Sequence, residues 1–105
     1  MVVRGILRAS RHHWQPWGSA VFSQVQRSSL SVQLNIAEGW SFGNSPTCTR
    51  HLSIAFGSSV ETIDLIELMI DEGIVPQSGG EKLRSHALRS HRLLIGLLKQ
   101  RRPFK

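Results

Sequence analysis

The sequence contains very little cysteine and no long apolar run. Its one cysteine, Cys48, cannot form an intrachain disulfide, and a single thiol excludes a zinc site built from cysteines. We expect a reducing, cytoplasmic setting for such a chain. No apolar stretch approaches the ~20 residues that a membrane-spanning helix needs. We therefore expect no membrane partner.

Acidic residues are also scarce. Seven Asp and Glu stand against thirteen Lys and Arg, which gives a net charge of +6 and a sequence pI near 11.1. None of the acids precedes Glu38, whereas residues 81–105 hold eight bases and one acid. A basic balance favours anionic partners such as RNA or DNA through long-range attraction.

No segment shows the alternation of apolar and polar residues that predicts a strand, whereas helical periodicity is clear. Ser45, a helix N-cap, precedes Pro46, and a helix stop follows at Gly73. Between these signals the apolar residues recur in steps of four and three: Leu52, Phe56, Ile63, Ile66 and Ile70. The predicted helices span residues 19–38, 45–72 and 81–102.

A further helix, short or degenerate, is expected within the poorly defined residues 1–15, before Pro16. Gly39 is predicted to end the helix that starts at residue 19, and the turn QSGG, residues 77–80, is predicted to precede the last helix. Short connections make neighbouring helices antiparallel. The predicted fold class is all-α: a single domain, residues 1–105, folded as an up-and-down antiparallel four-helix bundle.

Two stretches carry a family resemblance. The segments QVQRSSLSVQLNIAEGW, residues 24–40, and LSIAFGSSVET, residues 52–62, resemble the signature of a four-helix-bundle family. That family includes the 23S ribosomal RNA intervening-sequence proteins and the accessory variability proteins of diversity-generating retroelements. The resemblance implies a bundle that assembles into a homopentamer, is not an enzyme and has a basic surface suited to nucleic acid. In the retroelement branch it also implies a reverse transcriptase as partner.

The residues that match the family motif are Arg27, Asn35, Glu38, Gly39, Gly57, Ser58 and Glu61. Among them, Asn35, Glu38 and Glu61 also suggest a carboxylate site between helices, as in di-iron bundles. Such a site needs Glu-x-x-His pairs, and no histidine stands three residues after a Glu. The pattern favours hydrogen bonds near a helix end, with Arg27 or Arg50 as charge partner. No metal ligand, cofactor or catalytic residue is predicted.

A run of small residues, Gly57 to Ser59, lies within a predicted helix. Glycine there costs about 1 kcal/mol relative to alanine, and close approach of a neighbouring helix would compensate. The expected counterparts on the preceding helix are Ser28, Ser29 and Ser31. We interpret the run as a packing feature rather than a ligand site.

Charged residues form two stripes. The basic stripe, on the last helix, consists of Lys82, Arg89, Arg92 and Lys99. The acidic stripe, on the helix before it, consists of Glu61, Asp64, Glu67 and Asp71. Either the stripes pair with each other, between helices or subunits, or the basic stripe and the chain end bind phosphates. The predicted phosphate contacts are Arg89, Arg92, Lys99, Arg101 and Arg102.

A second apolar strip, Ile54, Leu65 and Leu68, lies beside the acidic stripe and predicts a contact between subunits. We therefore expect a non-enzymatic, homo-oligomeric helical bundle that acts as a nucleic-acid-binding accessory or scaffold without a cofactor. The alternative is a structural or protein-interaction module. Its partner would be a protein such as a reverse transcriptase, with no direct nucleic-acid contact.

Overall fold

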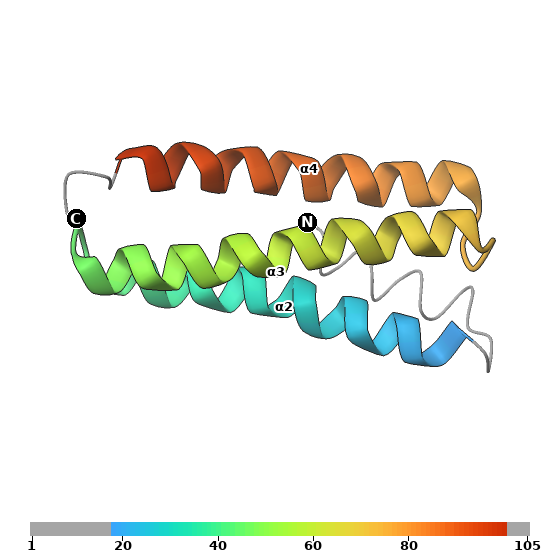
Figure 1. Cartoon of the computed structure of the whole chain (residues 1–105), viewed down its shortest axis with the longest axis horizontal. Coiled ribbons are helices and arrows are strands. Elements are labelled where there is room, and N and C mark those ends of the chain that lie inside the picture. Colours follow the sequence, from blue (N-terminus) through green and yellow to red (C-terminus); the bar gives the residue numbers. More distant parts are fainter. Residues whose placement is uncertain (1–17, 101–105) are drawn as a thin grey trace.

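The computed structural model describes residues 18–100, which form three helices and no strand. Helix α2 spans Ser19–Ser41, α3 spans Pro46–Asp71 and α4 spans Gln77–Gln100. Consecutive helices run antiparallel, and α3 packs against both α2 and α4 (Figure 1). The all-α prediction is confirmed. The predicted first helix, residues 1–15, lies outside the described residues, so the four-helix bundle stays a prediction.

Helix α2 continues past Gly39, where the sequence predicts its end. The helix ends at Ser41, and Gly43, with a φ of 63°, is the glycine that follows it. Gly39 is buried against α3, where a Cβ would lie 3.1 Å from the Cβ of His51 and 3.3 Å from the carbonyl oxygen of Cys48. The prediction of a helix stop was wrong because this glycine serves close helix packing.

Helix α3 follows the predicted signals at both ends. The Ser45 hydroxyl accepts a hydrogen bond from the Cys48 amide at 3.2 Å. Pro46 occupies the first helical position, where the N–H that proline lacks would have no partner within the helix. Gly73 follows the helix end with a φ of 68°. Local cap chemistry therefore sets the length of the central helix.

Helix α4 starts four residues earlier than predicted, because the segment 77–80 forms its first turn. The Gly80 amide donates to the Pro76 carbonyl oxygen at 2.8 Å. Gly80 is buried, and a Cβ there would overlap the Ile70 side chain and lie 3.1 Å from Val75 Cγ2. The close approach of the end of α3, rather than a turn, requires this glycine, so the predicted start at residue 81 was wrong.

Two apolar clusters form the core. The first contains the buried residues Phe22, Val25, Ile66, Met69, Ile74, Val75, Leu83 and Ala87, and the second contains Val32, Cys48, Leu52, Ala55 and Leu94. Along α2 and α3, the buried polar residues lie between the two clusters: Ser28, Ser29, Ser59 and Thr62. Because the centre of the bundle is polar, hydrogen bonds as well as apolar burial determine how α3 packs against its neighbours.

Candidate functional site

Polar side chains follow the line along which α2 and α3 meet. On α2 they recur in steps of four and three, which keeps them on one side of the helix: Gln24, Ser28, Ser31, Asn35 and Glu38. Their partners on α3 are His51, Ser58, Glu61 and Thr62. We call these nine residues the polar seam.

Hydroxyl contacts form the middle of the polar seam. Thr62 Oγ1 donates to Ser28 Oγ at 2.9 Å, and the hydroxyl oxygens of Ser31 and Ser58 lie 2.8 Å apart. Within residues 18–100, every buried side-chain nitrogen and oxygen has a hydrogen-bond partner. A shift of one helix along the other would break these pairs and leave Ser28 and Thr62 only the carbonyl partners of their own helices. The seam therefore stabilises one register of α2 against α3.

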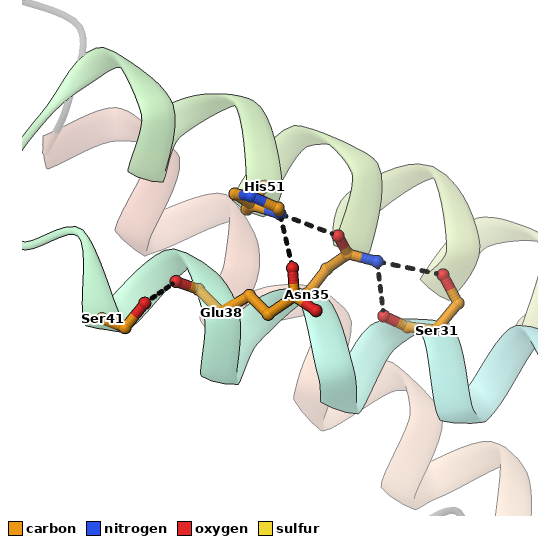
Figure 2. A network of polar contacts seen from close by, with 5 residues as sticks. All are labelled: Ser31, Asn35, Glu38, Ser41 and His51. Atoms are coloured by element: carbon orange, nitrogen blue, oxygen red, sulfur yellow. Dashed lines mark hydrogen bonds and ion pairs between the residues drawn. The ribbon is translucent and has the colours of Figure 1, made fainter.

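At one end of the polar seam, Asn35 uses one atom of its amide group within α2 and the other toward α3 (Figure 2). Its Nδ2 donates to the Ser31 carbonyl oxygen at 2.9 Å, and its Oδ1 lies 3.0 Å from His51 Nδ1. An amide oxygen can only accept, so His51 Nδ1 carries a proton and donates it to Asn35. Glu38 Oε2 lies 3.8 Å from the same nitrogen.

The arrangement differs from the predicted one in the charge partner. The sequence predicts Arg27 or Arg50 beside Asn35 and Glu38, whereas the structure brings His51 there. Arg27 instead donates to the Ser23 hydroxyl oxygen at 3.3 Å, one turn away on its own helix. The periodicity of α2 does not say which residue of α3 faces it. The short connection between the helices was the available signal, since it brings the end of α2 beside the start of α3.

Gly57, Ser58 and Ser59 face three different surroundings. Ser58 joins the polar seam, and Ser59, on the α4 side, donates to the Phe56 carbonyl oxygen at 2.7 Å. Since that bond uses the Ser59 proton, His91 Nδ1, 2.9 Å away, donates to Ser59. Gly57 is exposed, and nothing lies within 4 Å of the position of a Cβ there. The contact of Ser58 with Ser31 follows the prediction, whereas Ser59 faces α4 and Gly57 does not serve the contact between α2 and α3.

The outward surface of α4 carries the predicted basic stripe. Its four exposed residues, Lys82, Arg89, Arg92 and Lys99, are called the basic face below. None of them forms an ion pair with another described residue. Gly96 lies among them with nothing within 4 Å of its Cβ position, so the α4 backbone is open to close approach there. Arg101 and Arg102, predicted with this set, lie outside the described residues.

The acidic stripe on α3 is partly used within the chain. Glu67 Oε1 lies 3.4 Å from Arg84 Nε, which joins α3 to α4. Glu61 accepts a hydrogen bond from the Gln24 side chain as part of the polar seam. Arg84 does not belong to the basic face, so the pairing observed between these helices leaves the basic face available.

The apolar strip predicted on α3 divides into two kinds of residue. Ile54 and Leu68 are exposed, whereas Leu65 is partly buried and packs against the first apolar cluster. Leu65 therefore contributes to the core of its own chain. The prediction that Leu65 belongs to an external strip was wrong, because Leu65 lies at the edge of the core-facing side of α3.

Among the described residues, no three His, Cys, Asp or Glu side chains are grouped closely enough to hold a metal ion. Over the same part of the chain, no helix combines the length and apolar character that crossing a membrane requires.

An antiparallel arrangement of long helices, joined by a polar seam and bearing a basic face, defines a small all-helical bundle protein. The family model of the 23S rRNA-intervening sequence protein matches residues 15–96. The chain therefore belongs to the 23S rRNA-intervening sequence protein family. This confirms the resemblance read from residues 24–40 and 52–62, while the link to retroelement accessory proteins stays a prediction. Searches of the curated proteins and of the solved structures found no match.

Proposed function

We propose that the protein is a non-enzymatic, homo-oligomeric helical bundle that binds RNA or DNA through the basic face of α4. The observation that carries the proposal is the arrangement of four exposed cations on one outward helix surface, none paired with an acid of the described chain. Each Lys or Arg that meets a phosphate releases condensed counterions, which drives binding without base recognition. Arg101 and Arg102 add two cations to this set in the sequence.

The dimensions of the basic face suit a phosphate backbone. Lys82 and Lys99 are seventeen residues apart, which is roughly 25 Å along a helix. A duplex strand presents one phosphate per ~3.4 Å of its axis, so a stripe of this length passes several phosphates. Gly96, between Arg92 and Lys99, leaves this part of the stripe without a side chain and lets the ligand come close to the α4 backbone.

Assembly into a homo-oligomer is part of the proposal. A domain of 105 residues buries a smaller share of its surface than a larger domain does, so association adds stability. Large apolar side chains remain exposed on α2 and α3, among them Leu30, Leu34, Ile54, Val60 and Leu68. The resemblance to the bundle family favours a pentamer. We place the protein in the cytoplasm, where its one free thiol would stay reduced.

The alternative is a protein-interaction module whose partner is a protein such as a reverse transcriptase. The observation that favours it is the exposure of large apolar side chains, including Trp40 at 60% and Phe42 at 52% near the end of α2. In that case the basic face is a solvated surface. The alternative predicts no affinity for nucleic acid even at low salt.

Binding of the full chain to labelled RNA and DNA across a salt series separates these two functions. The proposal predicts measurable affinity at low salt. It also predicts a log–log decline with a slope of about −0.9 per phosphate contact on duplex DNA. No binding at low salt, or affinity that does not change with salt, contradicts the proposal and favours the protein-interaction module.

A further inference from the structure

The connection between α2 and α3 holds an aromatic ring that the polar seam does not use. Phe42, the residue after the end of α2, lies parallel to the His51 ring, with 5.6 Å between the ring centroids and an angle of 6° between the planes. Rings stacked with an offset at this separation attract each other. Phe42 nevertheless remains 52% exposed, so its phenyl ring has one face against His51 and much of its surface open to solvent. We call these two residues the stacked pair.

Hydrogen bonds hold both residues of the stacked pair in place. The Phe42 amide donates to the Gly39 carbonyl oxygen at 3.1 Å. His51 Nδ1 donates to Asn35 Oδ1 at 3.0 Å (Figure 2), and the His51 side chain is only 15% exposed. A surface that is already ordered loses little conformational entropy when a ligand packs on it. The stacked pair is therefore preorganised for a flat ligand.

Arg50 supplies a positive charge next to the stacked pair. It precedes His51 in α3, is exposed, and forms no ion pair with another described residue. The sequence contains no acid between residues 39 and 60. Glu38, the acid before this stretch, lies 3.8 Å from His51 Nδ1 and so belongs to the polar seam. The stacked pair therefore lies beside a cation that has no acidic partner within residues 18–100.

The stacked pair lies at the basic end of the bundle. Six of the seven acids fall within residues 61–81, the end of α3 and the start of α4. Because the helices are antiparallel, these acids lie toward the opposite end from Phe42 (Figure 1). Lys99, in the last turn of α4, comes to the same end as Phe42, and Leu98 beside it packs against the apolar cluster that contains Cys48. A phosphate backbone bound along the basic face therefore reaches this end of the bundle.

Trp40 adds a second large aromatic side chain at the same end. It is 60% exposed and stands four residues after Ile36, so the two lie on the same side of α2. Ile36 packs against the apolar cluster that also contains Leu94 of α4. Trp40 therefore continues the side of α2 that faces this cluster, whereas Phe42 lies against α3. Aromatic side chains thus lie on two sides of the end of α2.

A nucleotide of a single strand carries both of the groups that this end can bind. Its base offers a flat face to an aromatic ring, and its phosphate offers a negative charge to a cation. Stacking of this kind does not require a particular base, because every base has such a face. In a duplex the base faces are covered by neighbouring base pairs, so stacking favours unpaired bases. A protein partner would need a separate acid for Arg50, whereas one nucleotide supplies both groups.

We propose that the stacked pair, with Arg50 and Trp40, binds unpaired bases of a single-stranded RNA or DNA whose phosphates continue along the basic face of α4. Phe42 supplies the stacking surface, His51 holds it in place and Arg50 contacts a phosphate. The inference rests on the proposed function, and it adds that the ligand is single-stranded where it meets the end of α2. A duplex binds through the basic face alone.

The first test compares two single-stranded DNA ligands of equal length, one of mixed sequence and one in which an abasic site replaces every base. Both carry the same phosphates, but only the first can stack. Affinity for each ligand is measured at one low salt concentration, for the full chain in unmodified form and as two variants. Phe42→Leu keeps an apolar side chain without an aromatic face, and Phe42→Trp is the matched control that keeps a ring. Circular dichroism checks that both variants keep their helices.

We expect the unmodified protein to bind the base-bearing strand about tenfold more tightly than the abasic strand, because stacking adds to the phosphate contacts. Phe42→Trp should keep this difference, and Phe42→Leu should lose most of it while binding the abasic strand like the unmodified protein. Equal affinity of the unmodified protein for the two strands, or the same difference in both variants, overturns the inference and leaves phosphate binding by the basic face standing. No binding of either strand removes the proposed function as well.

A second test measures the salt dependence of binding to the base-bearing strand in Arg50→Ala. We expect the magnitude of the log–log slope to fall by about 0.7, the value for one phosphate contact on a single strand. Arg84→Ala is the control, because Arg84 already pairs with Glu67. An unchanged slope in Arg50→Ala contradicts the phosphate contact and overturns the inference. An RNA strand of the same sequence, measured beside the DNA strand, shows which of the two the stacked pair binds more tightly.

Discussion

Asn35 Oδ1 accepts a hydrogen bond from His51 Nδ1 at 3.0 Å, while the Nδ2 of the same side chain donates to the Ser31 carbonyl oxygen. The Ser31 bond fixes the amide on α2, and the amide oxygen then joins the end of α2 to the start of α3. Asn35 and Glu38 both lie against His51, and this contact accounts for the two residues without a bound ligand.

Replacement of Asn35 by alanine should lower the free energy of unfolding by about 1–3 kcal/mol, because the half-buried His51 Nδ1 loses its acceptor. Urea denaturation of the full chain measures this loss. Gln33→Ala is the matched control, since Gln33 is exposed on the same helix. A loss in Asn35→Ala no larger than in the control would show that the contact does not stabilise the fold.

Ser28 and Thr62 should be energetically coupled. Thr62→Val removes a buried hydroxyl while keeping the shape of the side chain, and Ser28→Ala removes its partner. Either single change removes the bond between the helices, while the remaining hydroxyl keeps a carbonyl partner in its own helix, Val25 for Ser28 or Ser58 for Thr62. The double-mutant cycle should give a coupling energy of about 0.5–3 kcal/mol. Strict additivity of the two single effects would contradict a direct bond in the seam.

Two glycines of α4 should respond to alanine in opposite directions. At Gly80 a Cβ would overlap Ile70, so Gly80→Ala should destabilise the fold by about 1–3 kcal/mol through overpacking. At Gly96 nothing lies within 4 Å, and Gly96→Ala should stabilise the helix by about 0.5–1 kcal/mol. Thermal unfolding followed by circular dichroism compares the two. Equal shifts of Tm in the same direction would rule out the close approach at Gly80.

Local signals predicted the helices better than the contacts between them. Ser45, Pro46 and Gly73 mark the ends of α3 through cap chemistry that a short stretch of sequence contains in full. Gly39 was predicted to end a helix and Gly80 to lie in a turn, and both predictions failed because a glycine that admits a neighbouring helix looks the same in sequence. Only the packing of a second helix distinguishes the two cases.

In the candidate site, too, local signals predicted the positions of residues better than the contacts between helices. The outward position of Arg89 and Arg92 follows from the periodicity of α4 alone, and the structure places both on its exposed surface. His51 could not be chosen as the partner of Asn35, because that choice depends on the register between two helices.

The role of the basic face is tested at single residues by the salt dependence of RNA and DNA binding in three variants. Arg89→Ala and Arg92→Ala each remove one exposed cation of the basic face, while Arg84→Ala removes a cation that already pairs with Glu67. All three lower the net charge equally. We predict that Arg89→Ala and Arg92→Ala each reduce the log–log salt slope by about 1 and that Arg84→Ala leaves it unchanged. Equal slopes for all three variants would contradict a binding surface on the basic face.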